Sequence, residues 1–376
     1  MIPEPNFPAN PDEFVGRKPQ LEAFRRALQQ GRKTGRSPSF AVLGDWGIGK
    51  SSLLLKCSAI CAEAQYNMLP VQFSVSKELA DYRNFAEGLL DTFSESLAHS
   101  RSATVRVQRE LKNWKISRVS VGAFTVDRDS PQFFLSSGSA ILRHALRDAW
   151  RRFISPAGFN GVIFFLDDLH NLASPSAEAI ALSVRDQFQS LAVDGINCSV
   201  CFSAPFNYFS NIRSFAEPAV RFYDKVYLEP FTQPETTEYV AAVFGGNAPN
   251  IEGFSEWLHA KTHGHPYFMA FICRQIAELA HGSLAHNVTV HHWPSIFARL
   301  ENEKFRSDLA QVPEREIQLL RNLALRPDDQ IIVKGLTAGD RAYFSRLTER
   351  GLLTRTARGR YKLYHPLFRE FLKQEM

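Results

Sequence analysis

The chain has 376 residues, of which 44% are hydrophobic and 22% charged, and its formal net charge is +5. This composition is typical of a globular protein with two or three domains, each with its own core. The longest apolar stretch, around Ile163–Leu166, is far too short to span a bilayer, and the N-terminus lacks a basic patch followed by an apolar run. We therefore expect a cytoplasmic protein with no membrane partner.

Five cysteines are scattered through apolar surroundings, and an odd number favours reduced core thiols over a disulfide framework. Cys198 and Cys201 have a zinc-like spacing. However, residues three apart in a strand face opposite sides, and no second pair with this spacing exists. The sequence therefore predicts buried thiols here and no zinc site.

The first part of the chain alternates between helical and strand patterns. The segment Phe14–Arg17 precedes a helix with an apolar face, and residues 31–37 read as a loop. Helical patterns over 51–65, 136–153 and 177–193 separate most of five short apolar runs. These runs are Phe40–Leu43, Pro70–Val75, Val162–Leu166, Asn197–Ser203 and Lys225–Leu228. Strands that are apolar on both faces and alternate with helices predict an α/β fold with a five-stranded parallel sheet.

The later segments predict further domains beyond a core over residues 1–232. Within that core, an insertion over 113–129 alternates with a period of two and predicts a β-hairpin. Residues 233–283 are helical throughout and predict a lid, and residues 284–312 predict linker helices. Residues 313–376 combine helices with a glycine-turned hairpin over 352–364, which predicts a winged-helix domain. From Pro313 onward there are 13 Lys and Arg against 8 Asp and Glu, so this domain carries the excess positive charge.

The segment Gly44–Ser51 matches the phosphate-loop pattern G-x-x-x-x-G-K-S in full, between a predicted strand and a predicted helix. In such a loop, backbone N–H groups and the helix N-terminus surround phosphate oxygens. We expect Lys50 to reach the β- and γ-phosphates of ATP and the Ser51 hydroxyl to ligate Mg²⁺. The expected nucleotide contacts in the loop are Gly44, Asp45, Trp46, Gly47, Ile48, Gly49, Lys50, Ser51 and Ser52.

Candidate catalytic residues lie next to three other predicted strands, two of them at strand ends and one just before a strand begins. Asp167 and Asp168 end an apolar strand, where the first would hold Mg²⁺ and the second would orient or deprotonate the attacking water. Ser203 ends the next strand, a place from which it would sense the γ-phosphate. Arg221 precedes the fifth strand and is the candidate arginine finger, in the same or a neighbouring subunit, with Arg213 as a rival.

The order of these motifs resembles that of the STAND-type ATPases, particularly the archaeal-type branch, which are relatives of the AAA+ replication initiators. Two further matches are Leu228–Phe231 and Gly264-His265-Pro266. The resemblance covers nearly the whole chain and implies that Val15, Gly16 and Arg17 lie near the adenine. It also implies that Pro266 packs against the base from the lid. The lid lacks the initiators' Gly-Asp-x-Arg pattern, which argues against a replication initiator.

The basic C-terminal domain has two interpretations, because its charges would serve either duplex DNA or solvent. In the first, a helix enters the major groove and the hairpin lies along phosphates; in the second, the domain packs on the lid as a regulatory piece. The candidate DNA contacts are Arg341, Arg346, Arg350, Arg355, Arg358, Arg360 and Lys362.

Together the motifs predict an ATPase with slow turnover, because Asp168 is one methylene shorter than the glutamate common at that position. The favoured function is an ATP-driven switch that couples nucleotide state to self-assembly or to engagement of a partner. An ATP-licensed DNA-binding regulator or loader and a non-hydrolysing nucleotide-binding scaffold remain as alternatives.

Overall fold

A computed structural model describes most of the chain and divides it into two compact units, Pro8–Glu229 and Met1–Phe7 with Pro230–Met376. The two units are described separately below. The described residues are 2–76, 82–100, 107, 110, 111, 114, 142–172, 176–209, 221–245, 248, 249, 251–280, 288–327, 331, 332, 338–357 and 359–375.

The first unit contains the predicted sheet, and all four of its strand pairings are parallel. The strand order β2-β3-β4-β1-β5 places the strand before the phosphate loop between β4 and β5. Since parallel strands end at the same edge, every segment that follows a strand emerges on one side of this sheet. The strands are β1 (Ser39–Leu43), β2 (Met68–Ser74), β3 (Gly161–Asp167), β4 (Cys198–Ala204) and β5 (Tyr223–Tyr227).

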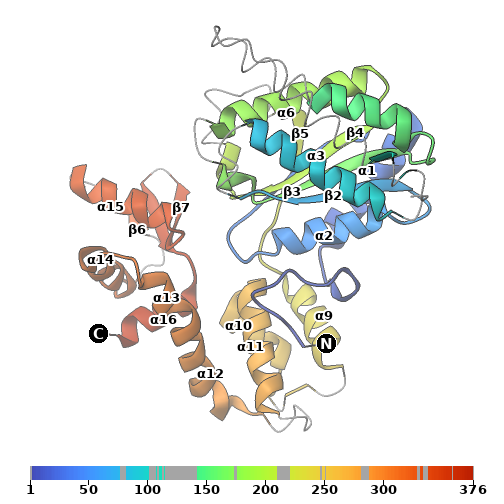
Figure 1. The fold of residues 1–376 in the computed structure, drawn as a ribbon. Coiled ribbons are helices and arrows are strands. Elements are labelled where there is room, and N and C mark those ends of the chain that lie inside the picture. The colour runs from blue at the N-terminus through green and yellow to red at the C-terminus, as the bar shows by residue number, and fades with distance from the viewer. Residues whose placement is uncertain are drawn as a thin grey trace. The chain divides into compact units, whose positions relative to one another are not determined.

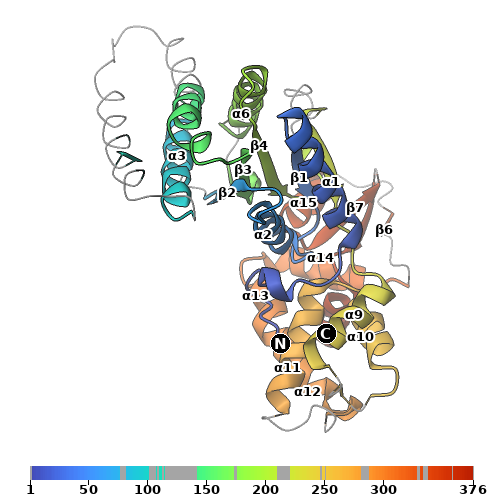
Figure 2. The ribbon, with the colours of Figure 1, turned by 90° about the vertical axis from the view of Figure 1, so that its right-hand side faces the viewer.

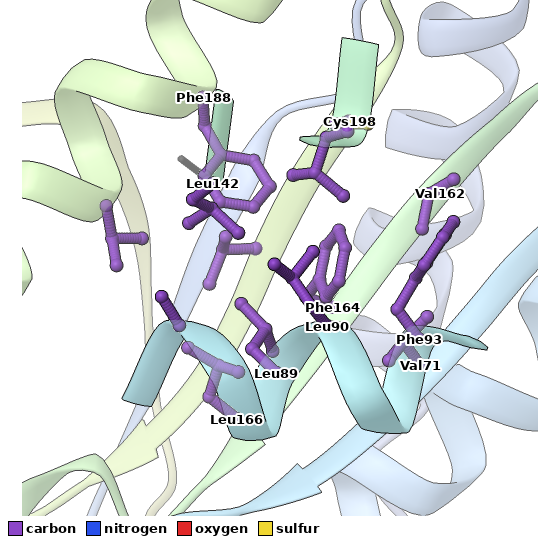
Figure 3. Packing of buried hydrophobic residues seen from close by; sticks show 14 of the residues in the cluster. Val71, Leu89, Leu90, Phe93, Leu142, Val162, Phe164, Leu166, Phe188 and Cys198 are labelled. Carbon is purple, nitrogen blue, oxygen red and sulfur yellow. The ribbon is translucent and has the colours of Figure 1, made fainter. Parts of the chain in front are cut away.

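Helices cover both faces of this sheet (Figures 1 and 2). On one face, α1 (Lys18–Thr34) and α2 (Lys50–Cys61) pack against strand residues such as Phe165. On the other, α3 (Tyr82–Ala98) and α6 (Ser176–Val193) pack against the alternate residues. Figure 3 shows Phe164 of β3 among Leu89, Leu90 and Phe93 of α3 and Phe188 of α6. The central strands β3, β4 and β1 are buried on both sides, which accounts for their continuous apolar sequences.

The sequence predicts a loop over residues 31–37, but this prediction is wrong for residues 31–34, because helix α1 continues to Thr34. Gly31 is buried, and a Cβ atom there would lie 2.4 Å from Ser37 Oγ, too close for any side chain. The glycine therefore marks the place where the returning chain crosses the helix, and it does not end the helix.

The first unit also contains the segment predicted as a hairpin and three short helical turns. The hairpin predicted over 113–129 lies outside the described residues apart from Trp114, whose indole N–H donates to Asp148 at 2.7 Å. The helix over 142–149 continues into a π-helical turn, Trp150–Ile154, before β3 begins. A short 3₁₀ turn, Pro11–Glu13, lies in the N-terminal segment, and a second, Leu169–Asn171, follows β3.

The second unit is mostly helical, with a small antiparallel sheet of order β6-β8-β7. The short strand β6 had no signal in the sequence, because two residues are too few to show a period. Within the described helices, none combines the length and apolarity needed to cross a membrane. The elements are α9 (Gln233–Phe244), α10 (Phe254–Thr262), α11 (Pro266–Leu279), a 3₁₀ turn (Val290–His292), α12 (Trp293–Leu300), a π-helical turn (Glu301–Phe305), α13 (Arg306–Leu309), α14 (Glu314–Ala324), β6 (Ile331–Ile332), α15 (Ala338–Glu349), β7 (Leu353–Ala357), β8 (Arg360–Leu363) and α16 (Pro366–Gln374).

One hydrophobic core joins the predicted lid, linker and C-terminal segments of this unit. Phe305 of the linker lies with its ring centroid 6.1 Å from that of Phe268 in α11 and 5.6 Å from that of Phe368 in α16. All three side chains are fully buried. Because these rings share one core, we expect the lid and the C-terminal segment to move as a single body.

His365 connects α16 to the end of α10 within the same unit. Its Nδ1 accepts a hydrogen bond from Leu367 N at 3.1 Å, so Nε2 carries the proton and donates to the Thr262 carbonyl oxygen at 2.8 Å. The side chain is only 3% exposed. Burial lowers the pKa of His365 to about 3; the hydrogen bond to Thr262 opposes this, and His265, His263 and Lys362 reinforce it.

The low pKa of His365 predicts acid sensitivity. The folded state binds fewer protons than the unfolded state, whose pKa is near 6.5, so stability present above that pH is lost as the pH falls below it. Between about pH 8 and about pH 5, this histidine is expected to remove about 2 kcal/mol from the free energy of unfolding. Denaturant titrations at both pH values measure the loss. His365→Asn, which keeps a cap acceptor, should shrink the pH dependence by a similar amount; an unchanged dependence contradicts the assignment.

Candidate functional site

The phosphate loop runs from Gly44, directly after β1, to Gly49, the residue that caps the N-terminus of α2. Gly47 and Gly49 have φ angles of 69° and 93°, a region that side-chain-bearing residues rarely adopt. Ile48, between them, is 2% exposed and packs in the core shared by α1 and α2. The loop is therefore anchored by one apolar side chain and shaped by its two flanking glycines.

Lys50 begins α2 and folds back over the loop. Its Nζ donates to the carbonyl oxygens of Gly44 at 3.1 Å and of Asp45 at 2.8 Å. Burial lowers the pKa of Lys50, and the carboxylates of Asp168, Asp45 and Asp167 oppose that shift. A half-buried ammonium held at the mouth of a loop of backbone N–H groups is suited to binding phosphate. Ser51 and Ser52 follow in the first turn, and Ser52 Oγ accepts a hydrogen bond from Ala9 N at 3.0 Å.

Asp167 and Asp168 are held by one buried serine. The Ser203 hydroxyl donates to Asp167 Oδ1 at 2.5 Å and accepts from Asp168 N at 2.8 Å. Ser203 itself is fully buried, and its separation from Asp167 by 36 residues hid this contact from sequence reasoning. The predicted γ-phosphate sensor thus contacts both aspartates directly, and its sensing role stays a prediction.

Asp168 occupies a left-handed backbone conformation, with φ of 56°. Such a conformation costs about 1 kcal/mol or more for a residue other than glycine and is found preferentially at functional sites. Burial raises the pKa of Asp168, as does the neighbouring Asp167, whereas His170 and Lys50 oppose the shift. A raised pKa makes the carboxylate a stronger base, which is the property required of a group that takes a proton from water.

The oxygen donors near the loop fit a hard cation such as Mg²⁺. They are the Ser51 hydroxyl on α2 and the Asp167 carboxylate, which Ser203 fixes at the edge where the strands end. No group of three or more His, Cys, Asp or Glu in the described parts of the chain is arranged to hold an ion. A magnesium ion bound by Ser51 and Asp167 would therefore take its other ligands from water and phosphate.

Arg17 makes contacts that the sequence did not predict. Arg17 as a whole residue is 4% exposed, and its guanidinium donates to the Ile48 carbonyl oxygen at 3.1 Å and to the Glu229 carbonyl oxygen at 2.6 Å. The resemblance placed it near the adenine together with half-buried Val15 and buried Gly16. The structure shows that its side chain contacts the phosphate loop itself, a contact that no local pattern signalled.

Arg221 lies at the opposite edge of the sheet from the loop. The parallel register sets Tyr227 beside Leu43, which precedes the loop, whereas Arg221 comes before β5 begins. The strand alone spans roughly 13 Å, more than an arginine side chain extends. The register therefore gives no support to a finger acting on its own chain's loop. The finger role of Arg221, in the same or a neighbouring subunit, stays a prediction. The rival Arg213 lies outside the described residues.

Trp46 and Pro266 are two further predicted nucleotide contacts. Trp46 is 54% exposed in the loop. Pro266 is the first residue of α11 in the second unit, so its approach to the base stays a prediction.

The basic candidates of the C-terminal segment divide into two groups. Arg346 on α15 bonds to the buried Glu316 of α14 through Nε at 2.8 Å, and Arg350 donates to the Gln311 carbonyl oxygen at 2.6 Å. Arg346 therefore joins α15 to α14, and Arg350, just after α15, contacts the chain just before α14. All the described candidates are exposed, and Arg346 and Arg350 differ from the rest in these contacts with α14 or the residues before it; the others are Arg341, Arg355, Arg360 and Lys362. Arg358 lies outside the described residues.

The five-stranded parallel sheet and its phosphate loop define the class of the protein, a P-loop ATPase of α/β fold. Residues 13–193 match the family described as AAA ATPase domain. No curated protein matches the chain.

Solved structures with the same fold span nearly the whole chain. The Walker-type ATPase of Pyrococcus abyssi has a TM-score of 0.60 and 14% identity, covering 99% of this chain and 100% of the other. The ORC2 protein of Aeropyrum pernix, in ADPNP–ADP complexes, has a TM-score of 0.57 and 15% identity, covering 99% and 97%. The ORC1 protein of the same organism, in complex with DNA, has a TM-score of 0.51 and 13% identity, covering 96% and 93%. At these identities the similarity establishes the fold.

Proposed function

We propose that the protein is a STAND-type, ATP-driven molecular switch, in which nucleotide at the phosphate loop sets the position of the unit Pro230–Met376. The observation that carries the proposal is the shared core of that unit, which makes lid and C-terminal segment one body. The chain passes between the two units only at Phe7–Pro8 and Glu229–Pro230. A body joined by two short connections can turn without unpacking its own core.

Labelled cysteines test the switch. All five native cysteines are buried, and burial raises the pKa of the Cys57 and Cys198 thiols to about 12, so they will react slowly. Fluorophores at Lys33→Cys on α1 and Lys373→Cys on α16 then report the separation of the two units by energy transfer. We expect different transfer efficiencies with ADP and with a non-hydrolysable ATP analogue. Equal efficiencies in all nucleotide states would refute the switch.

We also propose how hydrolysis resets the switch. Lys50 and the loop N–H groups hold the phosphates, and Ser51 with Asp167 holds Mg²⁺, which neutralises charge on the phosphates when bound. Asp168 orients the attacking water and accepts its proton, while Ser203 keeps both carboxylates in place. Arg221 would act on the loop of a neighbouring subunit, consistent with a nucleotide-dependent oligomer. Mass measurement with ADP and with an ATP analogue tests that assembly.

A second candidate function is ATP-licensed binding of duplex DNA. It is favoured by the exposed basic side chains of the hairpin formed by β7 and β8. Arg360 and Lys362 are two residues apart on β8, so both side chains project from the same face of the hairpin. On the opposite face, the paired residues Leu353 and Leu363 pack against the core. We interpret α14, α15 and this hairpin as a winged helix whose wing follows phosphates. The similar ORC1 protein was solved in complex with DNA.

Charge reversal on the wing separates these functions. Arg360→Glu/Lys362→Glu should weaken duplex binding and lower the slope of log affinity against log salt by about two, one for each lost phosphate contact. The control Arg315→Glu/Lys373→Glu makes the same change of charge at exposed sites on α14 and α16. Equal binding by both double variants and the wild type, measured by electrophoretic shift at two salt concentrations, would exclude the wing.

A further inference from the structure

Arg17 is a buried cation that joins two functionally different parts of the first unit. One partner, Ile48, belongs to the phosphate loop; the other, Glu229, is the last residue before the connection to Pro230. Because Arg17 is only 4% exposed, its guanidinium needs acceptors such as these carbonyl oxygens to replace the water it has lost. Arg17 also has a left-handed backbone, with φ of 58°, as the residue that caps α1.

The contact with Ile48 has a direct consequence for phosphate binding. The Ile48 carbonyl and the Gly49 N–H belong to one planar peptide unit and point in opposite directions. Fixing the carbonyl toward Arg17 therefore fixes the Gly49 N–H on the opposite side of that plane. In a phosphate loop the N–H groups before the lysine are the phosphate donors. The guanidinium thus acts on the phosphate through the peptide between Ile48 and Gly49.

The contact with Glu229 extends this effect to the connection between the units. Leu228, the residue before it, donates its N–H to the Leu43 carbonyl oxygen at 2.8 Å, so the chain leaving β5 is also tied to the start of the loop. Phosphate bound to the Gly49 N–H polarises its peptide and strengthens the hydrogen bond from Arg17 to Ile48. A planar guanidinium that moves toward one acceptor changes its geometry with the other.

We propose that Arg17 is a positioning residue that orients the Gly49 N–H toward phosphate and transmits phosphate occupancy to the Glu229–Pro230 connection. The second half of this proposal rests on the switch proposed above, whereas the first half does not. A lysine at this position keeps the charge but lacks the planar fork needed to hold two carbonyl oxygens at once.

The test compares Arg17→Lys with Arg32→Lys, a control on the same helix whose arginine donates to the Gln65 carbonyl oxygen at 2.9 Å from an exposed position. Fluorescent ADP measures affinity, and the Lys33→Cys/Lys373→Cys pair measures the response at saturating nucleotide. We expect Arg17→Lys to weaken ADP binding by about tenfold, the effect of one charge-assisted hydrogen bond. We also expect it to lose at least half of the ADP-to-ATP difference in energy transfer, whereas Arg32→Lys changes neither.

The positioning role and the transmission of phosphate occupancy can be refuted independently. Wild-type affinity in Arg17→Lys overturns the positioning role, whatever the units do. A full energy-transfer response in that variant overturns the transmission, and an absent response in the wild type refutes the switch while leaving the affinity result intact. Arg17→Met, which buries no charge, provides a second variant should Arg17→Lys unfold, as judged by thermal denaturation. It is expected to show the same loss of affinity and response, and wild-type behaviour would overturn the proposal.

Discussion

Lys50→Ala is expected to weaken ATP binding by at least about 100-fold and to abolish measurable turnover. The substitution removes an ammonium that lies over the loop, bonded to the Gly44 and Asp45 carbonyl oxygens. With it go the charge-assisted hydrogen bonds that we propose Lys50 makes to phosphate. Such bonds contribute about 3 kcal/mol, which corresponds to about two orders of magnitude in affinity. Calorimetric titration with a non-hydrolysable ATP analogue measures the loss directly.

A lysine on the same helix provides the control for this experiment. Lys56 donates to the Pro11 carbonyl oxygen at 2.7 Å and does not belong to the loop. Lys56→Ala should bind nucleotide as the wild type does. If Lys50→Ala also retained wild-type affinity, the loop over Gly44–Ser51 would not be the nucleotide site.

Asp168→Asn is expected to leave nucleotide affinity within a few-fold of the wild type and to lower turnover by about 100-fold or more. The amide has the same shape but cannot accept a proton, and general-base catalysis contributes about two to four orders of magnitude. The backbone hydrogen bond from Asp168 N to Ser203 survives the change, so the turn should keep its conformation. Steady-state phosphate release measures turnover, and Asp186→Asn on α6 is the matched control.

The pH profile adds a second criterion for Asp168. Its pKa is raised above the ordinary value of 3.8, and only the deprotonated carboxylate accepts a proton, so turnover should fall as the pH drops through that raised pKa. Turnover by Asp168→Asn equal to that of the wild type would remove Asp168 from catalysis. Negligible turnover by the wild-type protein itself would favour the alternative of a non-hydrolysing scaffold.

The sequence by itself determined the sheet and the loop. Each of the five predicted runs overlaps one of β1–β5. The three central strands, β3, β4 and β1, are buried on both faces and therefore need continuous apolar residues, whereas the edge strand β5 is mostly exposed. The loop pattern was recognisable because its requirements are local: glycines at turns with positive φ, followed by a lysine and a hydroxyl at a helix N-terminus. Asp167 and Asp168 were found in the same way, as carboxylates ending an apolar strand.

Only the tertiary structure decided what joins these parts. Ser203 contacts Asp167 across 36 residues, and Arg17 contacts Glu229 across 212, distances over which no periodic pattern carries information. The parallel register placed Arg221 at the far edge of the sheet, and the core around Phe268, Phe305 and Phe368 merged segments that the sequence presents as separate domains. Local chemistry thus predicted the phosphate loop, whereas packing between distant segments determined which residues contact it and which segments share one core.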